Sequence, residues 1–154
     1  MMQQMFLGYG GGGDSNIAAS GGSLINYNNV NYHVFKTSGT FTAPSDFNST
    51  INYIILGGGG GASYSTPSGN GGPGGGGAGA LIDKSSVPLS GPFSLTVTVG
   101  DGGTKGTVVN TKGSDGGNSS VNFPGGTLTA AGGGAAGESD PGSGAPVPSN
   151  GPGN

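Results

Sequence analysis

The feature that most constrains this chain is its glycine, which supplies 39 of the 154 residues and includes uninterrupted runs such as 57–61. Glycine has no side chain to bury, and it loses more backbone entropy on folding than any other residue. The core must come from an apolar fraction of only 31%. We therefore expect a thin core, marginal stability as a monomer, and oligomerisation that supplies the missing burial.

The apolar residues nevertheless fall into short clusters between the glycine tracts, which is typical of strands and not of a disordered linker. Residues 51–56 form a nearly continuous apolar run, and residues 94–99 alternate apolar residues with threonine. Asn28 and Asn29 separate two alternating segments and suit a tight turn, because asparagine tolerates positive φ. The other candidate strands cover residues 24–27, 31–36, 40–42, 80–82, 107–109, 120–123 and 127–130.

These strands predict an all-β fold, a small antiparallel β-sandwich or jelly-roll-like domain with long glycine-rich loops. We divide the chain into an extended N-terminal attachment arm (1–14), a glycine-rich β domain (20–131) and a Gly/Pro-rich tail (132–154). The connection 57–79 is much longer than is usual in a compact domain, which indicates a functional or disordered loop. A second interpretation is that the glycine tracts adopt extended, polyproline II-like backbone and pack glycine against glycine.

The scarcity of charged residues and the absence of cysteine exclude several classes of protein. Only 7% of the residues are charged, the net charge is -3, and there is no arginine or basic run, so we expect no nucleic-acid partner. The absence of cysteine excludes disulfides and thiolate metal sites. Apolar runs are too short for a membrane span, and the N-terminus does not resemble a secretory signal. We expect no membrane insertion and a protein that stays in a cytoplasm or leaves by lysis.

Little in the sequence resembles an active site. The single histidine, His33, lies in a strand-like run without a recognisable partner for catalysis. Asp101 and Asp115 lie in Asp-Gly-Gly turns, where aspartate has a structural role, and the glycine tracts lack the Lys-Ser/Thr of a phosphate-binding loop. We expect a non-enzymatic protein with no catalytic residue, metal or cofactor, with calcium on the aspartate loops as the remaining alternative.

Two segments are candidates for contacts with partners. The N-terminal arm gathers adaptable methionines and aromatic residues before a glycine run, which favours a docking peg over a loose terminus. In the long loop, a tyrosine and an asparagine have the chemistry to stack on and hydrogen-bond a cell-surface glycan, or the tyrosine packs within an oligomer. The candidates are Met1, Met2, Met5, Phe6, Leu7 and Tyr9 in the arm, and Tyr64 and Asn70 in the loop.

Residues 39–61, GTFTAPSDFNSTINYIILGGGGG, resemble the glycine-rich domain of bacteriophage virion proteins, especially tail-fibre proteins. Three further landmarks follow in the family's order: LTVTVGDGG (95–103), GGNSSVNF (116–123) and TLTAAGGGAAG (127–137). The resemblance covers residues 35–137. The N-terminal MMQQMFLGYGGGG is also similar to the leader of some marine phage proteins, including cyanophage structural proteins.

This resemblance implies a virion component that is made in the host cytoplasm and released on lysis. Its partners would be other copies of itself, with a homotrimer as the default for phage fibres, and other virion proteins of the tail, baseplate or capsid. The family transfers no catalytic or ligand site to this chain. We expect a tail fibre or tail-associated protein that mediates assembly and host attachment. A capsid decoration (cement) protein and a receptor-binding adhesin tip are the alternatives.

Overall fold

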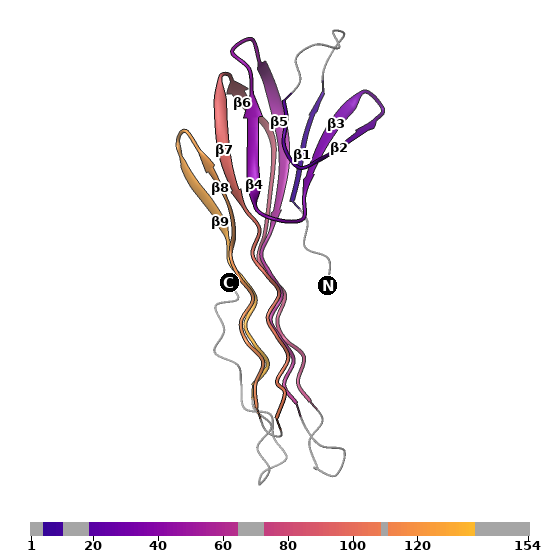
Figure 1. Cartoon of the computed structure of the whole chain (residues 1–154), viewed down its shortest axis with the longest axis vertical. Coiled ribbons are helices and arrows are strands. Elements are labelled where there is room, and N and C mark those ends of the chain that lie inside the picture. Colours follow the sequence, from indigo (N-terminus) through magenta and orange to yellow (C-terminus); the bar gives the residue numbers. More distant parts are fainter. Residues whose placement is uncertain (1–4, 11–18, 65–72, 109–110, 138–154) are drawn as a thin grey trace.

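The computed structural model describes residues 5–10, 19–64, 73–108 and 111–137, whose secondary structure consists of strands and turns (Figure 1). The strands form two antiparallel sheets, so the predicted all-β sandwich is confirmed. The strands are β1 (Met5–Gly10), β2 (Ser23–Tyr27), β3 (Val30–Phe35), β4 (Gly39–Ala43), β5 (Asn48–Leu56), β6 (Leu81–Ser90), β7 (Phe93–Thr98), β8 (Ser119–Phe123) and β9 (Gly126–Ala130).

The two sheets have different strand orders. One has five strands in the order β2-β3-β1-β5-β6, and the other has four in the order β4-β7-β8-β9. Most predicted strands occur, and β6 extends well beyond the predicted 80–82. The prediction of a strand at 107–109 is wrong for Thr107 and Val108, which lie in no strand, and residue 109 is outside the described part. The Val108 carbonyl instead accepts the N–H of Thr111 at 3.2 Å.

Local sequence rules account for the β2–β3 hairpin and for β7. Asn28 and Asn29 have φ of 49° and 60°, and positive φ at both central residues is what a two-residue type I′ turn requires. Along β7, Leu95 and Val97 are buried whereas the alternating residues Ser94, Thr96 and Thr98 are exposed. This alternation places one face of β7 in the core.

The core lies between the sheets and is rich in phenylalanine. Phe41 on β4 packs edge-on against His33 of the opposite sheet, with ring centroids 5.0 Å apart. Its ring also lies 5.6 Å from that of Phe93, which contacts Phe47 in turn. Phe41 and Phe47 are almost completely buried. A small set of large aromatic side chains therefore compensates for the low apolar content.

The structure differs from the expected N-terminal arm over residues 5–10, which include Met5, Phe6 and Tyr9. These residues form β1 in the middle of the five-stranded sheet, hydrogen-bonded to β3 on one side and β5 on the other. The Leu7 side chain is 1% exposed and belongs to the core. Pairing along both strand edges and burial of Leu7 favour insertion into the domain over projection from it. Met1 and Met2 lie outside the described residues.

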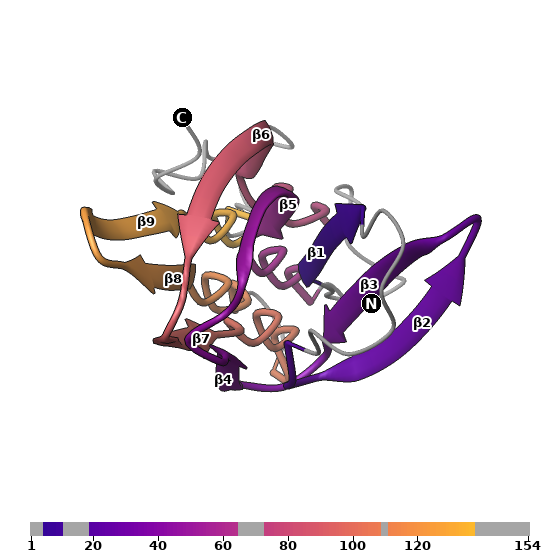
Figure 2. The same ribbon diagram turned by 90° about the horizontal axis from the view of Figure 1, so that it is seen from above.

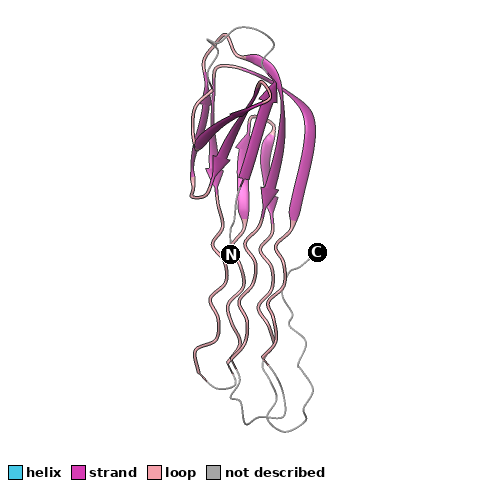
Figure 3. Ribbon diagram, turned by 90° about the vertical axis from the view of Figure 1, so that its right-hand side faces the viewer, coloured by secondary structure: helices cyan, strands magenta, loops and turns pink. Residues whose placement is uncertain are grey.

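Beyond the sandwich, glycine-rich segments form a narrow bundle in which each segment continues a strand (Figures 1 and 3). Residues 57–64 continue β5, and residues 73–80 lead into β6. Residues 100–106 follow β7, residues 111–118 lead into β8, and residues 131–137 continue β9. We call these five segments the glycine bundle. Viewed from above in Figure 2, they run as coils side by side.

Backbone hydrogen bonds join the segments of the glycine bundle with a period of three residues. In segment 57–64, every third N–H bonds to segment 73–80, and the next residue of each triplet bonds to segment 111–118. The first set is Gly57 to Ala80 at 2.9 Å, Gly60 to Gly77 at 2.8 Å and Ser63 to Gly74 at 3.1 Å; the second is Gly58 to Gly117 at 2.9 Å, Gly61 to Ser114 at 2.9 Å and Tyr64 to Thr111 at 3.0 Å.

A three-residue period without internal hydrogen bonds is the geometry of polyproline II backbone. Residues 57–64 and 73–80 are therefore hydrogen-bonded elements of the fold, as the second interpretation of the glycine tracts predicted, and not parts of an open loop. Residues 131–137, assigned from the sequence partly to the tail, are a further bundle segment. The rest of the predicted tail, 138–154, is outside the described residues.

Burial of one tyrosine makes the stability of the sandwich decrease as pH rises in the alkaline range. Tyr53 on β5 is 5% exposed and packs on Phe123, and desolvation raises the pKa of Tyr53 above the usual 10.0. Above about pH 10 the unfolded chain releases this proton while the folded protein still holds it, so the free energy of unfolding falls as pH rises.

We expect urea midpoints to decline between about pH 9 and about pH 11, and Tyr53→Phe to flatten that decline. Tyr27→Phe, at an exposed tyrosine, is the matched control and should leave the decline unchanged. Equal slopes for wild type and Tyr53→Phe would contradict this assignment.

Candidate contact surfaces

At the central contacts of the glycine bundle, glycine is the only residue that fits. A Cβ atom at Gly57 would lie 2.0 Å from the carbonyl oxygen of Ala131, and one at Gly60 would lie 2.0 Å from that of Gly134. These oxygens belong to the backbone of a neighbouring segment, so they have no flexible side chain that could move aside. The bundle is therefore a backbone-packed rod that extends away from the sandwich (Figure 3).

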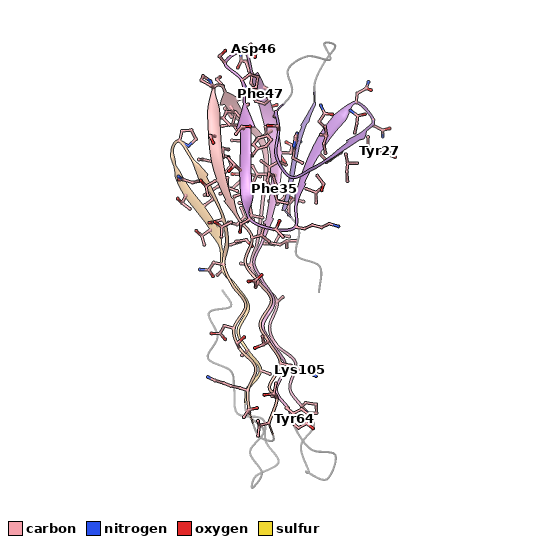
Figure 4. All side chains as sticks on the ribbon, viewed as in Figure 1. Tyr27, Phe35, Asp46, Phe47, Tyr64 and Lys105 are labelled. Carbon is pink, nitrogen blue, oxygen red and sulfur yellow. The ribbon has the colours of Figure 1, made fainter. Side chains whose placement is uncertain are left out.

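At that far end, backbone hydrogen bonds hold three segments side by side. The Tyr64 N–H donates to the carbonyl of Thr111 at 3.0 Å, and the Gly106 N–H donates to the carbonyl of Ala62 at 2.9 Å. Exposed residues of this last layer include Pro73, and we call Tyr64, Lys105, Thr107, Val108 and Lys112 the tip surface. Figure 4 shows Tyr64 and Lys105 near the end of the bundle that is distant from the sandwich.

The sequence identified one member of the tip surface. Tyr64 is 40% exposed, as a surface contact requires, whereas Asn70 lies outside the described residues. Sequence reasoning missed Val108, which is 63% exposed, and both lysines. No local pattern singled out the lysines, because Lys105 and Lys112 flank residues 107–109, which the sequence predicted to be a strand.

A second exposed surface lies on the sandwich. β2 is an edge strand that pairs with β3, and all five of its residues are exposed. Leu24, Ile25 and Tyr27 are 60%, 51% and 64% exposed, and we call them the β2 flank. In Figure 1 the β2–β3 hairpin is turned away from the four-stranded sheet, and Figure 4 labels Tyr27 on it.

The β2 flank lacks the usual protection of an edge strand. Natural edge strands carry charges, prolines or bulges that prevent pairing with another chain. β2 has the sequence SLINY, which contains no charged residue and no proline. Its register with β3 is regular, so it has no bulge. Sequence reasoning predicted this strand but missed its exposure, because alternating residues do not reveal whether a second sheet covers them.

The titratable residues His33 and Asp115, which were singled out from the sequence, make hydrogen bonds within the fold. His33 is 1% exposed, and its Nδ1 lies 2.8 Å from the carbonyl oxygen of Gly21, to which it donates. The Asp115 carboxylate accepts the N–H of Ala135 at 2.7 Å and so fastens two bundle segments together. Within residues 5–10, 19–64, 73–108 and 111–137, no three His, Cys, Asp or Glu side chains gather as metal ligands do.

Comparison with protein families gives one match, in which residues 36–154 correspond to a family described as a glycine-rich domain. The chain belongs to this glycine-rich domain family. The matched region begins directly after β3 ends at Phe35, so it contains β4 to β9 and the glycine bundle. β1, β2 and β3, with the β2 flank, precede the family region.

Searches of curated proteins and of solved structures gave no match to this glycine-rich domain protein. The described part of the chain also contains no helix with the length and apolar character needed to cross a membrane.

Proposed function

We propose that this glycine-rich domain protein is a non-enzymatic structural component of a bacteriophage virion, a tail fibre or tail-associated protein that joins other virion proteins and contacts the host surface. In this proposal it is made in the host cytoplasm and released on lysis. The observation that carries the proposal is the placement of two exposed surfaces on an elongated molecule: the β2 flank on the sandwich and the tip surface at the far end of the glycine bundle.

The glycine bundle supports separate roles for the β2 flank and the tip surface. Its segments bond to each other every third residue, and a rod of that kind holds the tip at a fixed separation from the sandwich. Fibres and adhesins need such a separation between attachment and recognition. The landmarks in the sequence that resemble virion proteins add support for a phage origin.

The β2 flank is the surface we assign to assembly. An uncharged, apolar edge strand offers free backbone groups and apolar side chains to a neighbouring chain. Exposed apolar patches rimmed by polar residues commonly mark protein–protein contacts. We propose that copies of the protein associate through this flank as a homotrimer, which also supplies burial that a thin core lacks.

Counting copies in purified particles tests the position in the virion. Quantitative mass spectrometry should give a few to a few dozen copies per particle for a tail protein. A count in the hundreds would contradict the tail assignment and favour the decoration alternative. Purified protein added in excess should block adsorption of the phage to its host, and undiminished adsorption at saturating protein would refute the host-contact role.

Charge on the β2 flank should prevent assembly without unfolding the protein. Ile25 and Tyr27 alternate with Asn26 and share one face of the strand, so Ile25→Lys with Tyr27→Lys places two charges there. Because both side chains are exposed, the free energy of unfolding should change by no more than about 1 kcal/mol. Light scattering should show monomers, and the variant should be missing from particles.

The matched control is Thr129→Lys, an exposed position on β9 in the other sheet, which should assemble normally. An oligomer that persists in the Ile25→Lys, Tyr27→Lys protein would exclude the β2 flank as the assembly surface.

A further inference from the structure

Charge is distributed unevenly along the glycine bundle. Asp101 and Asp115 lie in the half near the sandwich, whereas Lys105 and Lys112 lie in the half near the tip. The Gly117 N–H bonds to the carbonyl of Asp101 at 2.7 Å, which fixes Asp101 close to the strands. Among the charged residues of the bundle that the structure describes, the two lysines are therefore the ones nearest the tip.

The register of two antiparallel segments places Lys105 and Lys112 at nearly the same height along the bundle. The Ser114 N–H donates to the carbonyl of Thr104 at 2.9 Å, and their hydroxyls lie 3.1 Å apart. Continued toward the tip, this register sets residue 112 opposite residue 106. Lys112 and Lys105 therefore lie within one turn of each other on neighbouring segments, and both are exposed.

Tyr64 joins this pair from a third segment. Its backbone bonds to Thr111, the residue before Lys112. Two residues earlier, the Ala62 carbonyl accepts the N–H of Gly106, the residue after Lys105. An exposed aromatic ring offers an apolar face for stacking on a sugar ring. Ammonium groups beside it offer charge-assisted hydrogen bonds to carboxylate or phosphate.

We infer that the tip surface binds an anionic polysaccharide, with Tyr64 stacking on a sugar ring and Lys105 and Lys112 pairing with its carboxylate or phosphate groups. This inference rests on the proposed host contact and names its ligand class. A neutral glycan would gain nothing from two lysines at the tip. A nucleic acid is a poor fit, because phosphate-backbone binding uses a longer run of cations than two lysines provide.

The test measures binding of the full-length protein to three polymers with one backbone: dextran, carboxymethyl dextran and phosphorylated dextran. At low salt we expect at least about tenfold tighter binding to one or both charged forms than to dextran, with a loss of that difference at high salt. The two charged forms distinguish a carboxylate from a phosphate ligand. Equal binding of all three polymers, or no binding of either charged form, would overturn the inference.

Variants locate the site. Lys105→Gln with Lys112→Gln should weaken binding of the charged dextran at least about tenfold, and Tyr64→Ala should weaken it as well. The matched control, Lys36→Gln with Lys84→Gln, changes the net charge equally at exposed positions on the sandwich and should bind normally. If both double variants lost binding of the charged dextran equally, the effect would come from the overall charge of the protein, and the site would be refuted.

Competition for phage adsorption separates this inference from the proposed function. If the Lys105→Gln, Lys112→Gln protein blocks adsorption as well as wild type, the anionic ligand is wrong and the host contact stands. If neither protein blocks adsorption, the host contact itself fails.

Discussion

Alanine at Gly61 should disrupt the glycine bundle and lower the free energy of unfolding by roughly 3–5 kcal/mol. Gly61 lies in the central segment, where a Cβ atom would be 1.9 Å from the carbonyl oxygen of Thr104 and 2.5 Å from its carbonyl carbon. Both atoms belong to backbone, so the segments must separate to admit the methyl group.

That separation would break hydrogen bonds on other sides of the same residue. The Gly61 N–H donates to Ser114 at 2.9 Å, and the Gly61 carbonyl accepts the N–H of Ala136 at 2.9 Å. Each lost backbone hydrogen bond costs about 1 kcal/mol, and overpacking a tight contact costs about 1–3 kcal/mol. The two effects together give the expected loss.

Gly75→Ala is the matched control, because a Cβ atom at Gly75 would have nothing within 4 Å. There the substitution should be neutral or stabilising by up to about 1 kcal/mol, since alanine restricts the unfolded chain. Denaturant unfolding measures both variants, and amide exchange should show lost protection in segments 57–64 and 111–118 for Gly61→Ala alone. Equal effects of the two substitutions would refute the backbone-packed bundle.

The parts of the fold that the sequence predicted well are those governed by local rules. The alternation in residues 94–99 and the Asn28–Asn29 pair each have one dominant physical interpretation, and the structure confirms both. β1 was harder to predict. A short apolar segment at a terminus satisfies the pattern of a peg and of an inserted strand equally, and its pairing with β3 and β5 depends on residues far away in the sequence.

The glycine bundle shows where sequence patterns carry little information. Glycine is required wherever a segment faces another backbone, as at Gly57 and Gly60, but a run of five glycines satisfies every possible register. The partners of segment 57–64 are residues 73–80 and 111–118, among others, and nothing local specifies them. The sequence therefore allowed extended glycine packing but not its order.

The tip surface also depends on contacts that no local sequence pattern specifies. Lys105 and Lys112 are near each other in the sequence, but Tyr64 joins them only through the bundle's hydrogen bonds. The β2 flank depends equally on tertiary structure, since its residues are exposed because the four-stranded sheet does not cover β2.

Phe41→Ala should lower the free energy of unfolding by about 3–5 kcal/mol, a large share of the stability of a small domain. Phe41 is fully buried, and its ring contacts His33 in the five-stranded sheet and Phe93 in its own. Removing it leaves a cavity between the sheets. Tyr27→Ala, at a side chain that is 64% exposed, is the control and should cost no more than about 1 kcal/mol in the monomer.

The same variant tests whether the sandwich and the glycine bundle fold as one unit. Segment 57–64 follows β5 directly, and segment 131–137 follows β9 directly, so a separated sheet no longer holds the bundle segments in register. Phe41→Ala should therefore reduce amide protection in the bundle as much as in the strands, although Phe41 lies in the sandwich. A bundle that keeps wild-type protection while the strands lose theirs would show that the rod is an independent folding unit.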